Sequence, residues 1–317
     1  MIRRRWALSL LAAALLALAL WRGGASGWPA PAGQPIAPRR ALGAAVLAGQ
    51  LFVAGGWSGT ATQLDTVEVW EASSGRWRAG AALQVARSQH ALVAVSGQLW
   101  AVAGWSQTRG LVPEMERWAP GAGWQVAGHL PQPRREPGAA AWDNEIVIAG
   151  GFDGASDGDL EGYSTRVDVF DPATRAWRRL PNLAVPRRGL VLVASGGQLF
   201  ALGGYSAEGG FLNVVERYTR GASAWERLDW PITPRTWAAG VVLGDSVVLA
   251  GGYNLEGYQA RIERVALATG AACLVRPLRE PRAWLAAVPW EGGVLTLGGE
   301  AAGGMTGAVE WSTGKCQ

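Results

Sequence analysis

Lysine, cysteine and histidine are nearly absent from this sequence. Of the 29 basic residues only Lys315 is a lysine, and there are two cysteines and two histidines, His90 and His129. So few thiol and imidazole groups exclude a clustered histidine or cysteine metal site, and the sequence has neither a nucleophile elbow nor a phosphate-binding loop. We therefore expect no cofactor.

Net positive charge is lacking from most of the chain. The formal charge is +4, but residues 1–27 hold four arginines and no acid, and the rest of the chain carries 25 basic and 25 acidic residues. Proteins that bind nucleic acid present a concentrated basic surface. A neutral body argues against nucleic acid as a partner.

No uninterrupted apolar run reaches the roughly 20 residues that a membrane-spanning helix needs. The uncharged run at residues 6–21 follows three consecutive arginines, Arg3 to Arg5, and precedes small residues that end at Gly27. This order is typical of a secretory signal. We expect cleavage before Trp28, and the alternative is an uncleaved anchor, in which case membrane contact is limited to residues 6–21. In both cases residues 28–317 are exported, to a periplasm or beyond.

What the sequence does have is a repeat. Six apolar runs end in small residues, mostly a glycine pair, and an aromatic residue usually follows. The last glycines of these runs are Gly56, Gly104, Gly151, Gly204, Gly252 and Gly299. Their intervals of 48, 47, 53, 48 and 47 residues indicate one structural unit copied six times.

Each unit is predicted to contain four antiparallel strands. In the first unit, two apolar runs joined by a turn at Gly49 predict a hairpin, residues 66–70 alternate as a third strand, and a fourth begins near Trp77. The expected repeats are about 39–86, 87–133, 134–186, 187–234, 235–281, and 282–317 together with 28–38. Each repeat opens with an arginine: Arg39, Arg87, Arg134, Arg187, Arg235 and Arg282. Each third strand carries an acid: Glu68, Glu116, Asp168, Glu216, Glu263 and Glu310.

This combination resembles the kelch repeat. The matching features are the double glycine with its following aromatic, the third-strand Glu-x-aromatic pattern, and the fourth-strand tryptophans Trp77, Trp124, Trp177 and Trp225. The resemblance implies an all-β fold, a six-bladed β-propeller with four antiparallel strands per blade. Two positions depart from the pattern, because Ala103 replaces a first glycine and Cys273 stands near an expected tryptophan.

Closure of the ring is expected to involve both chain ends. The sixth repeat has three strands only, and Trp28 lies 11 residues before Arg39, close to the spacing of ten between the other tryptophans and arginines. We predict that residues near Trp28 supply the outer strand of the last blade, although Pro29 and Pro31 restrict such a strand to an edge. Cys273 and Cys316 either form a disulfide near this closure or are two small buried hydrophobes.

The function is expected on the face that carries the loops between strands two and three. These loops share a face with the blade connections, and loops on a rigid scaffold commonly carry binding sites. The expected ligand-binding rim consists of Trp57, Gln89, Trp105, Phe152, Tyr205, Trp237, Tyr253 and Trp284. Aromatic faces beside arginine and glutamate suit sugar rings. The structural alternative is that the aromatics cap the propeller and that each opening arginine pairs with its third-strand acid.

The sequence leaves the activity open between classes of function. Our first hypothesis is a non-enzymatic binding module for a protein or a glycan, and a purely structural protein is possible. The alternative is a sugar mutarotase or epimerase, because the resemblance extends to an exported six-repeat kelch group that mutarotates sialic acid. Its candidate proton-transfer residues here are Glu136, His90 and Glu300. An acidic loop with Asp153, Asp157, Asp159 and Glu161 is a weak candidate for calcium, and an ordinary solvated loop is the stronger reading.

Overall fold

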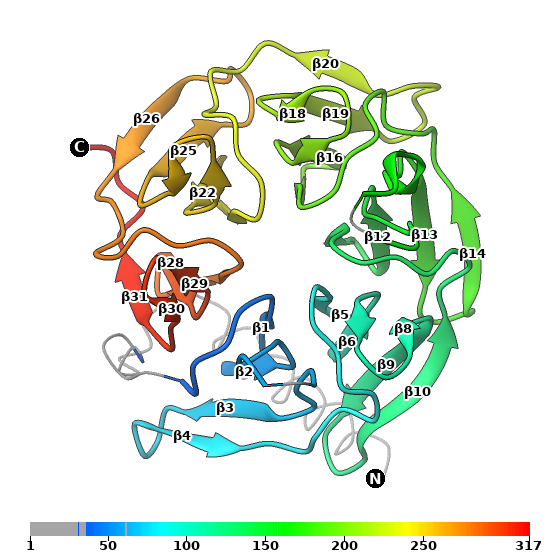
Figure 1. The fold of residues 1–317 in the computed structure, drawn as a ribbon, viewed down its shortest axis with the longest axis vertical. Helices are drawn as coiled ribbons and strands as arrows, with labels where there is room; N and C mark the ends of the chain where they lie inside the picture. The colour runs from blue at the N-terminus through cyan, green and yellow to red at the C-terminus, as the bar shows by residue number, and fades with distance from the viewer. Residues whose placement is uncertain (1–30, 32–35, 61, 157) are drawn as a thin grey trace, which may run out of the picture.

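Six β-sheets stand as blades around a central axis in the computed structural model, which confirms the predicted six-bladed propeller (Figure 1). The structure describes Pro31 and residues 36–60, 62–156 and 158–317. The first strands of the six blades surround the axis. They are β1 (Gly43–Leu47), β5 (Ala91–Val95), β11 (Gly138–Trp142), β15 (Val191–Ser195), β21 (Ala239–Leu243) and β27 (Ala286–Trp290).

The second and third strands follow outward in antiparallel order. The second strands are β2 (Gln50–Ala54), β6 (Gln98–Val102), β12 (Glu145–Ala149), β16 (Gln198–Leu202), β22 (Ser246–Ala250) and β28 (Gly293–Leu297). The third strands are β3 (Val67–Glu71), β9 (Glu114–Ala119), β13 (Val167–Asp171), β19 (Val215–Thr219), β25 (Ile262–Ala266) and β31 (Val309–Ser312).

Outer strands complete five blades within the described residues, and the sixth sheet has three strands there. The outer strands are β4 (Arg76–Ala79), β10 (Gly123–His129), β14 (Ala176–Arg179), β20 (Glu226–Leu228) and β26 (Ala272–Val275). The loops between strands two and three carry four short ribbons and one 3₁₀ turn. These are β7 (Trp105–Ser106) with β8 (Gly110–Leu111), β17 (Tyr205–Ser206) with β18 (Gly210–Phe211), β23 (Tyr253–Asn254) with β24 (Gly257–Tyr258), β29 (Glu300–Ala301) with β30 (Gly304–Met305), and η1 (Leu160–Gly162).

The hydrophobic core lies between the blades. Each buried cluster combines side chains from two neighbouring sheets, because both faces of every sheet carry apolar residues. The fourth-strand tryptophans pack against the preceding blade: Trp124 joins the cluster between the first two blades, and Trp225 joins the cluster between the third and fourth. These tryptophans therefore help to fill the space between neighbouring blades. Repeat proteins are held together by such contacts between neighbours.

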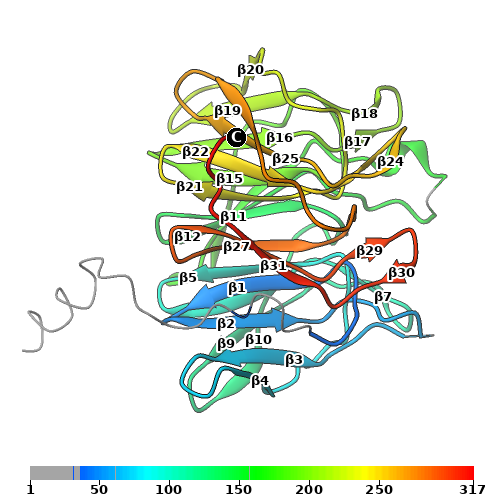
Figure 2. The same ribbon diagram turned by 90° about the vertical axis from the view of Figure 1, so that its left-hand side faces the viewer.

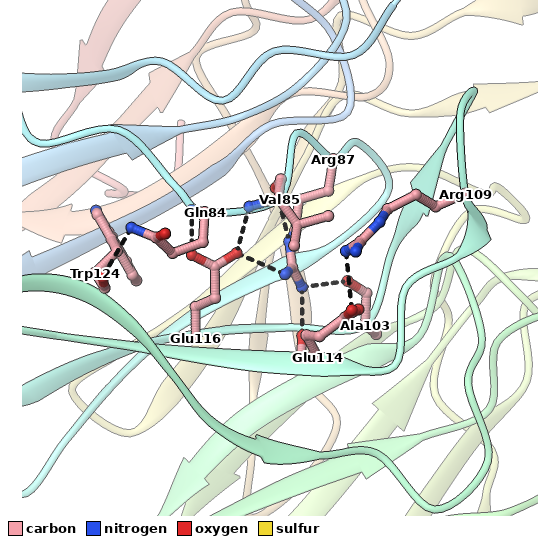
Figure 3. Close-up of polar contacts among 8 residues, drawn as sticks. All are labelled: Gln84, Val85, Arg87, Ala103, Arg109, Glu114, Glu116 and Trp124. Atoms are coloured by element: carbon pink, nitrogen blue, oxygen red, sulfur yellow. Dashed lines mark hydrogen bonds and ion pairs between the residues drawn. The ribbon is translucent and has the colours of Figure 1, made fainter.

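The six opening arginines are buried and pair with the third-strand acid of their own blade, as the structural alternative predicted. In the second blade, Arg87 and Glu116 are fully buried, with 2.7 Å between Nη2 and Oε1 (Figure 3). The guanidinium also donates to the carbonyls of Ala103 and Glu114. The carboxylate accepts from the backbone N–H groups of Gln84 and Val85 in the blade connection. One ion pair thus joins the first strand, the third strand and the connection.

The backbone of each opening arginine binds the preceding blade. The second glycine of each pair donates its N–H to the carbonyl of the next arginine, for example Gly56 to Arg87 at 2.8 Å. The series closes on itself, since Gly299 donates to Arg39 at 2.9 Å. Ala103, which departs from the repeat, adopts the left-handed backbone (φ 63°) of its glycine equivalents, so the second blade keeps the common geometry.

Both ends of the described chain contact the last blades. The N–H of Ile36 donates to the carbonyl of Gly307 in the sixth blade. Leu83 makes the equivalent bond in the first blade, where its N–H donates to the carbonyl of Asp65 just after the outer strand ends. The predicted outer strand near Trp28 lies outside the described residues and stays a prediction. At the other end, a disulfide joins Cys316 to Cys273 on β26, and Gln317 donates to Leu274. No helix of the described part of the chain is long and apolar enough to cross a membrane.

Loss of one buried carboxylate should destabilise the propeller strongly. Glu116→Ala leaves the Arg87 guanidinium buried without its counter-ion, which should lower the free energy of unfolding by about 3–5 kcal/mol in urea denaturation. The matched control is Glu226→Ala, since Glu226 pairs with Arg217 at the surface and is 58% exposed; it should cost less than about 1 kcal/mol. Equal losses in the two variants would contradict the structural role of the buried pair.

Candidate functional site

The predicted rim residues gather on one face of the propeller. In every blade the residue after the opening arginine pairs with the residue after the last glycine, as Arg40 does with Trp57 and Ser88 with Trp105. The ribbons that follow stand together on one side of the molecule (Figure 2). We call this side the rim face.

A closed ring of six hydrogen bonds surrounds the axis at this face. It is formed by the residue two positions after each opening arginine, and each N–H donates to the carbonyl of the equivalent residue in the preceding blade at 2.8–3.0 Å. The members of this axial ring are Ala41, Gln89, Glu136, Gly189, Trp237 and Trp284. All six have left-handed backbones with φ between 53° and 62°. Five are not glycine, and such strained positions concentrate at functional sites.

Side chains of the axial ring meet over the axis. The carboxylate of Glu136 accepts from the indole N–H of Trp237 at 2.8 Å and from the amide of Gln89 at 3.1 Å. Trp237 reaches Glu136 across the intervening blade because Gly189 stands there, and a Cβ at Gly189 would lie 2.7 Å from the indole of Trp237. The Arg188 guanidinium lies 3.7 Å from the same carboxylate. These contacts leave only a small cavity of about 110 Å³ on the axis, which His90 also lines.

The larger hollow is an off-axis cleft of about 550 Å³ beside the first two blades. Four predicted rim residues line it, and the small Ala41 of the axial ring leaves it open toward the axis. Its lining comprises Arg40, Ala41, Trp57, Thr60, Gln63, Ser88, Gln89, Trp105, Gln107, Arg135 and Trp284. Three indoles, three primary amides and two guanidinium groups thus face one space.

Arg40 is held in the wall of this cleft by three neighbours. Its guanidinium lies 4.5 Å from the ring centre of Trp57 and 5.6 Å from that of Trp284, and it forms an ion pair with Glu300. Burial, together with the nearby Glu300 carboxylate, raises the pKa of the Tyr258 hydroxyl. Glu300, predicted as a proton-transfer residue, therefore orients an arginine of the cleft.

The other predicted rim aromatics lie in a different half of the rim face. Phe152, Tyr205 and Tyr253 belong to a chain of rings, which we call the aromatic arc, with neighbouring centroids 4.0–6.2 Å apart. The arc runs from the third blade to the sixth through Phe152, Tyr163, Tyr205, Phe211, Tyr253, Trp237 and Trp284, with Tyr258 against Tyr253. Trp284 belongs to both the arc and the cleft. The rim face is thus divided into a hollow half and an aromatic half.

The sequence pattern does not point to several residues of these two halves. Arg40, Gln63, Gln107 and Arg135 line the cleft, and Tyr163, Phe211 and Tyr258 extend the arc. One feature of the sequence could have indicated Arg40 and Arg135. The residue after the opening arginine varies among Arg, Ser, Thr and Ala, as expected for a position that the structural repeat does not fix. Tyr163, Phe211 and Tyr258 lie in the second half of the loop between strands two and three. The repeat has no fixed residue type at these positions.

In the acidic loop, the carboxylates of Asp153 and Asp159 accept hydrogen bonds from neighbouring protein groups. Asp159 accepts from the N–H groups of Ala155 and Glu161 and begins η1, and Asp153 accepts from Gln132 at 2.7 Å. Asp157 lies outside the described residues. In the part of the chain that the structure covers, no three or more histidine, cysteine, aspartate or glutamate side chains are grouped to hold a metal ion.

His90 is a packing residue between the first two blades. It stands where three other blades place Leu42, Leu190 and Leu285, and it is 8% exposed, with both ring nitrogens unpartnered. A Cβ at Gly43 or Gly55 would lie within 2.9 Å of its ring, so those glycines make room for it. Burial, and secondarily the Arg87 charge, lowers the pKa of His90 to about 3. A neutral imidazole of this kind is a poor proton donor near pH 7.

His90 should make the fold sensitive to acid. The pKa of His90 in the folded protein lies below the ordinary value of about 6.5. Between pH 6.5 and 3 the unfolded chain therefore binds a proton at His90 and the folded chain does not, so the free energy of unfolding decreases as the pH falls through this range. Relative to His90→Leu, the natural protein should lose about 2 kcal/mol of unfolding free energy between pH 7.5 and 5. His129→Gln, which changes an exposed histidine, serves as the control and should follow the natural protein. Parallel pH profiles for the natural protein and His90→Leu would refute this assignment.

Comparison with known proteins gives consistent matches. The Kelch motif matches residues 38–84, 133–184 and 186–229. Alpha-scruin of Limulus polyphemus is 30% identical over 97 residues, which are 30% of this chain and 10% of the relative. Kelch-like protein 25 of Xenopus tropicalis is 30% identical over 82 residues, which are 26% of this chain and 13% of the relative. The matched part thus spans about a tenth of each of these longer proteins.

A solved structure supports the same fold over nearly the whole length. The structure of YjhT superposes with a TM-score of 0.75 at 15% sequence identity and covers 88% of this chain and 96% of its own. At that identity the likeness concerns the fold alone. The matched motifs and relatives identify the chain as a kelch-repeat protein, and the six sheets and this superposition identify its fold as a β-propeller.

Proposed function

We propose that this protein is an exported, non-enzymatic binding module that holds a glycan in the off-axis cleft. The kelch propeller fold suggests a binding module, and the observation that carries the proposal is the lining of the cleft. Indole faces pack against the C–H faces of sugar rings, and amides and guanidinium groups bind hydroxyls, which is the usual composition of a small-ligand site. Trp57, Trp105 and Trp284 supply the rings, while Gln63, Gln89 and Gln107 supply the amides.

The proposed location outside the cytoplasm has one independent support. Cys273 and Cys316 form a disulfide, and disulfides persist mainly in oxidising compartments. The basic, apolar and small-residue order of residues 1–27 agrees with export. Immunodetection of the protein in periplasmic and cytoplasmic fractions tests this part directly.

Saccharide binding should depend on the cleft. In a thermal-shift screen of the purified protein against monosaccharides and cell-wall sugars, a ligand at 100 times its dissociation constant should stabilise the fold by about 2.7 kcal/mol. Trp105→Ala and Gln107→Ala should each weaken the binding of that sugar about tenfold or more in calorimetry, because each removes a cleft contact.

Trp311→Ala is the matched control, since Trp311 is 40% exposed on β31, away from the cleft. It should leave affinity unchanged. Gln107 is exposed, so Gln107→Ala keeps the experiment informative if Trp105→Ala fails to fold. Full affinity in both cleft variants would overturn the proposed site.

Mutarotation is the second candidate function. The observation in its favour is the Glu136 carboxylate at the axis, hydrogen-bonded to Gln89, which also lines the cleft. Against it, the three candidate groups already have other roles or environments: Glu136 binds Trp237, Glu300 binds Arg40, and His90 is buried and neutral.

An enzymatic role would depend on Glu136. If the protein accelerates anomer exchange of a bound sugar in NMR exchange spectra, Glu136→Gln should slow that exchange at least about 100-fold. The amide can still accept from Trp237, so the melting temperature should stay near that of the natural protein. An unchanged rate in Glu136→Gln would remove this carboxylate from the mechanism, and no acceleration by the natural protein would leave the binding module as the function.

A further inference from the structure

Two leucines project from the loop tips above the aromatic arc. Leu255, at the turn between β23 and β24, is 93% exposed, and Leu160, in η1, is 70% exposed. They are the two most exposed large hydrophobic side chains in the described part of the chain. Exposed apolar groups over half-buried rings commonly mark an interaction surface.

The arc connects these tips into one surface. The ring centroid of Tyr163, next to η1, lies 6.2 Å from that of Tyr205 in the fourth blade. The ring centroid of Phe211 in the same blade lies 6.0 Å from that of Tyr253, which is close to Leu255 in the sequence. Tyr163, Tyr205, Phe211, Tyr253 and Tyr258 are all half-buried, so part of each ring faces solvent. Tyrosine supplies contact area at low entropic cost and is enriched at protein interfaces.

The charged side chains at the tips of these loops are all acidic, while the Arg188 guanidinium lies below them against one face of Tyr163, 5.4 Å from its ring centre. Glu161, Glu208 and Glu256 are exposed at the tips of the third, fourth and fifth blades, and residues 160–163, 207–209 and 255–257 contain no basic side chain. The loops beside the cleft differ, because residues 57–63 and 105–111 contain Arg109 and no acid. The two halves of the rim face thus differ in shape and in side-chain type, and their loop tips differ in charge.

We propose that the surface made by Leu160, Leu255 and the tyrosines of the arc binds a basic polypeptide segment with interspersed apolar side chains. Apolar side chains of the partner pack against the two leucines, and its cationic groups pair with the three glutamates. Lysine or arginine also binds the faces of the tyrosine rings by cation–π attraction. Charge complementarity sets the choice of partner and the association rate, and the apolar anchors hold the complex. This docking surface is separate from the cleft and does not depend on a glycan ligand.

The test uses three fluorescent peptides of equal length and the purified protein. One alternates lysine with leucine, one glutamate with leucine, and one lysine with serine. In fluorescence polarisation the lysine–leucine peptide should bind about tenfold or more tightly than either of the others, because only it satisfies both the acidic and the apolar groups. Equal affinity for the glutamate–leucine peptide would overturn the proposed partner chemistry.

Matched variants locate the surface. Leu160→Ser combined with Leu255→Ser should weaken the lysine–leucine peptide about tenfold or more, and Glu208→Lys with Glu256→Lys should slow its association. The control is Leu274→Ser, since Leu274 is 48% exposed on the outer strand β26. All of these side chains are exposed, so the fold should survive. Unchanged affinity in the double leucine variant would refute the docking surface.

Hydrogen exchange separates this surface from the cleft. Bound peptide should protect the amides of residues 158–163 and 253–258, whereas protection confined to residues 57–63 would place the peptide in the cleft and overturn the proposal. A sugar that saturates the cleft should leave peptide affinity unchanged. The docking surface and the glycan site can therefore fail independently.

Discussion

The structure depends on one residue type placed six times, the buried arginine that opens each repeat. Its guanidinium binds the acid of the third strand in its own blade, and its carbonyl accepts from the glycine N–H of the preceding blade. A buried charge is costly unless it is paired and fully hydrogen-bonded. Burial lowers the pKa of Arg187 to about 10, which still leaves the group charged near neutral pH. The position therefore tolerates little change, and it fixes the blades at the end where the rim face begins.

The residue two positions after each opening arginine, which belongs to the axial ring, varies in type from blade to blade. The axial ring needs a left-handed backbone and a hydrogen bond, and it accommodates side chains of very different size, with Gly189 leaving room for the indole of Trp237. Ala41 and Gly189 are small, while Trp237 and Trp284 are large. The Trp237 indole reaches Glu136 at the axis, and the larger open space lies off the axis, where Ala41 is part of the cleft lining. A repeated scaffold thus yields an asymmetric site through side chains that differ in size and in bonding from blade to blade.

Much of the fold could be predicted from the sequence because its causes are local and repeated. The glycine intervals predict the six blades, and the spacing of Arg87 and Glu116 predicts a pair at one blade end. The contacts that define the site have another origin. Trp237 meets Glu136 from a position 101 residues away, which requires both the curvature of the ring and the absence of a side chain at Gly189. The sequence makes His90 a candidate proton-transfer group, but the environment of its ring depends on Gly43 and Gly55 of the neighbouring blade. Such contacts follow from the three-dimensional closure and leave no periodic signal.

The two closed series of hydrogen bonds distinguish this protein from open arrays of repeats. In a linear solenoid, stability is a sum over units and their neighbours, so a unit can be gained or lost with little effect on the rest. Here every N–H of the axial ring already donates to a carbonyl of the preceding blade, and the ring closes where Ala41 donates to Trp284. A chain with five or seven copies would have to rebuild all six contacts at a new angle. Repeat number in this propeller is consequently a property of the whole circle, because the gain or loss of one blade changes the angle at every contact of the ring.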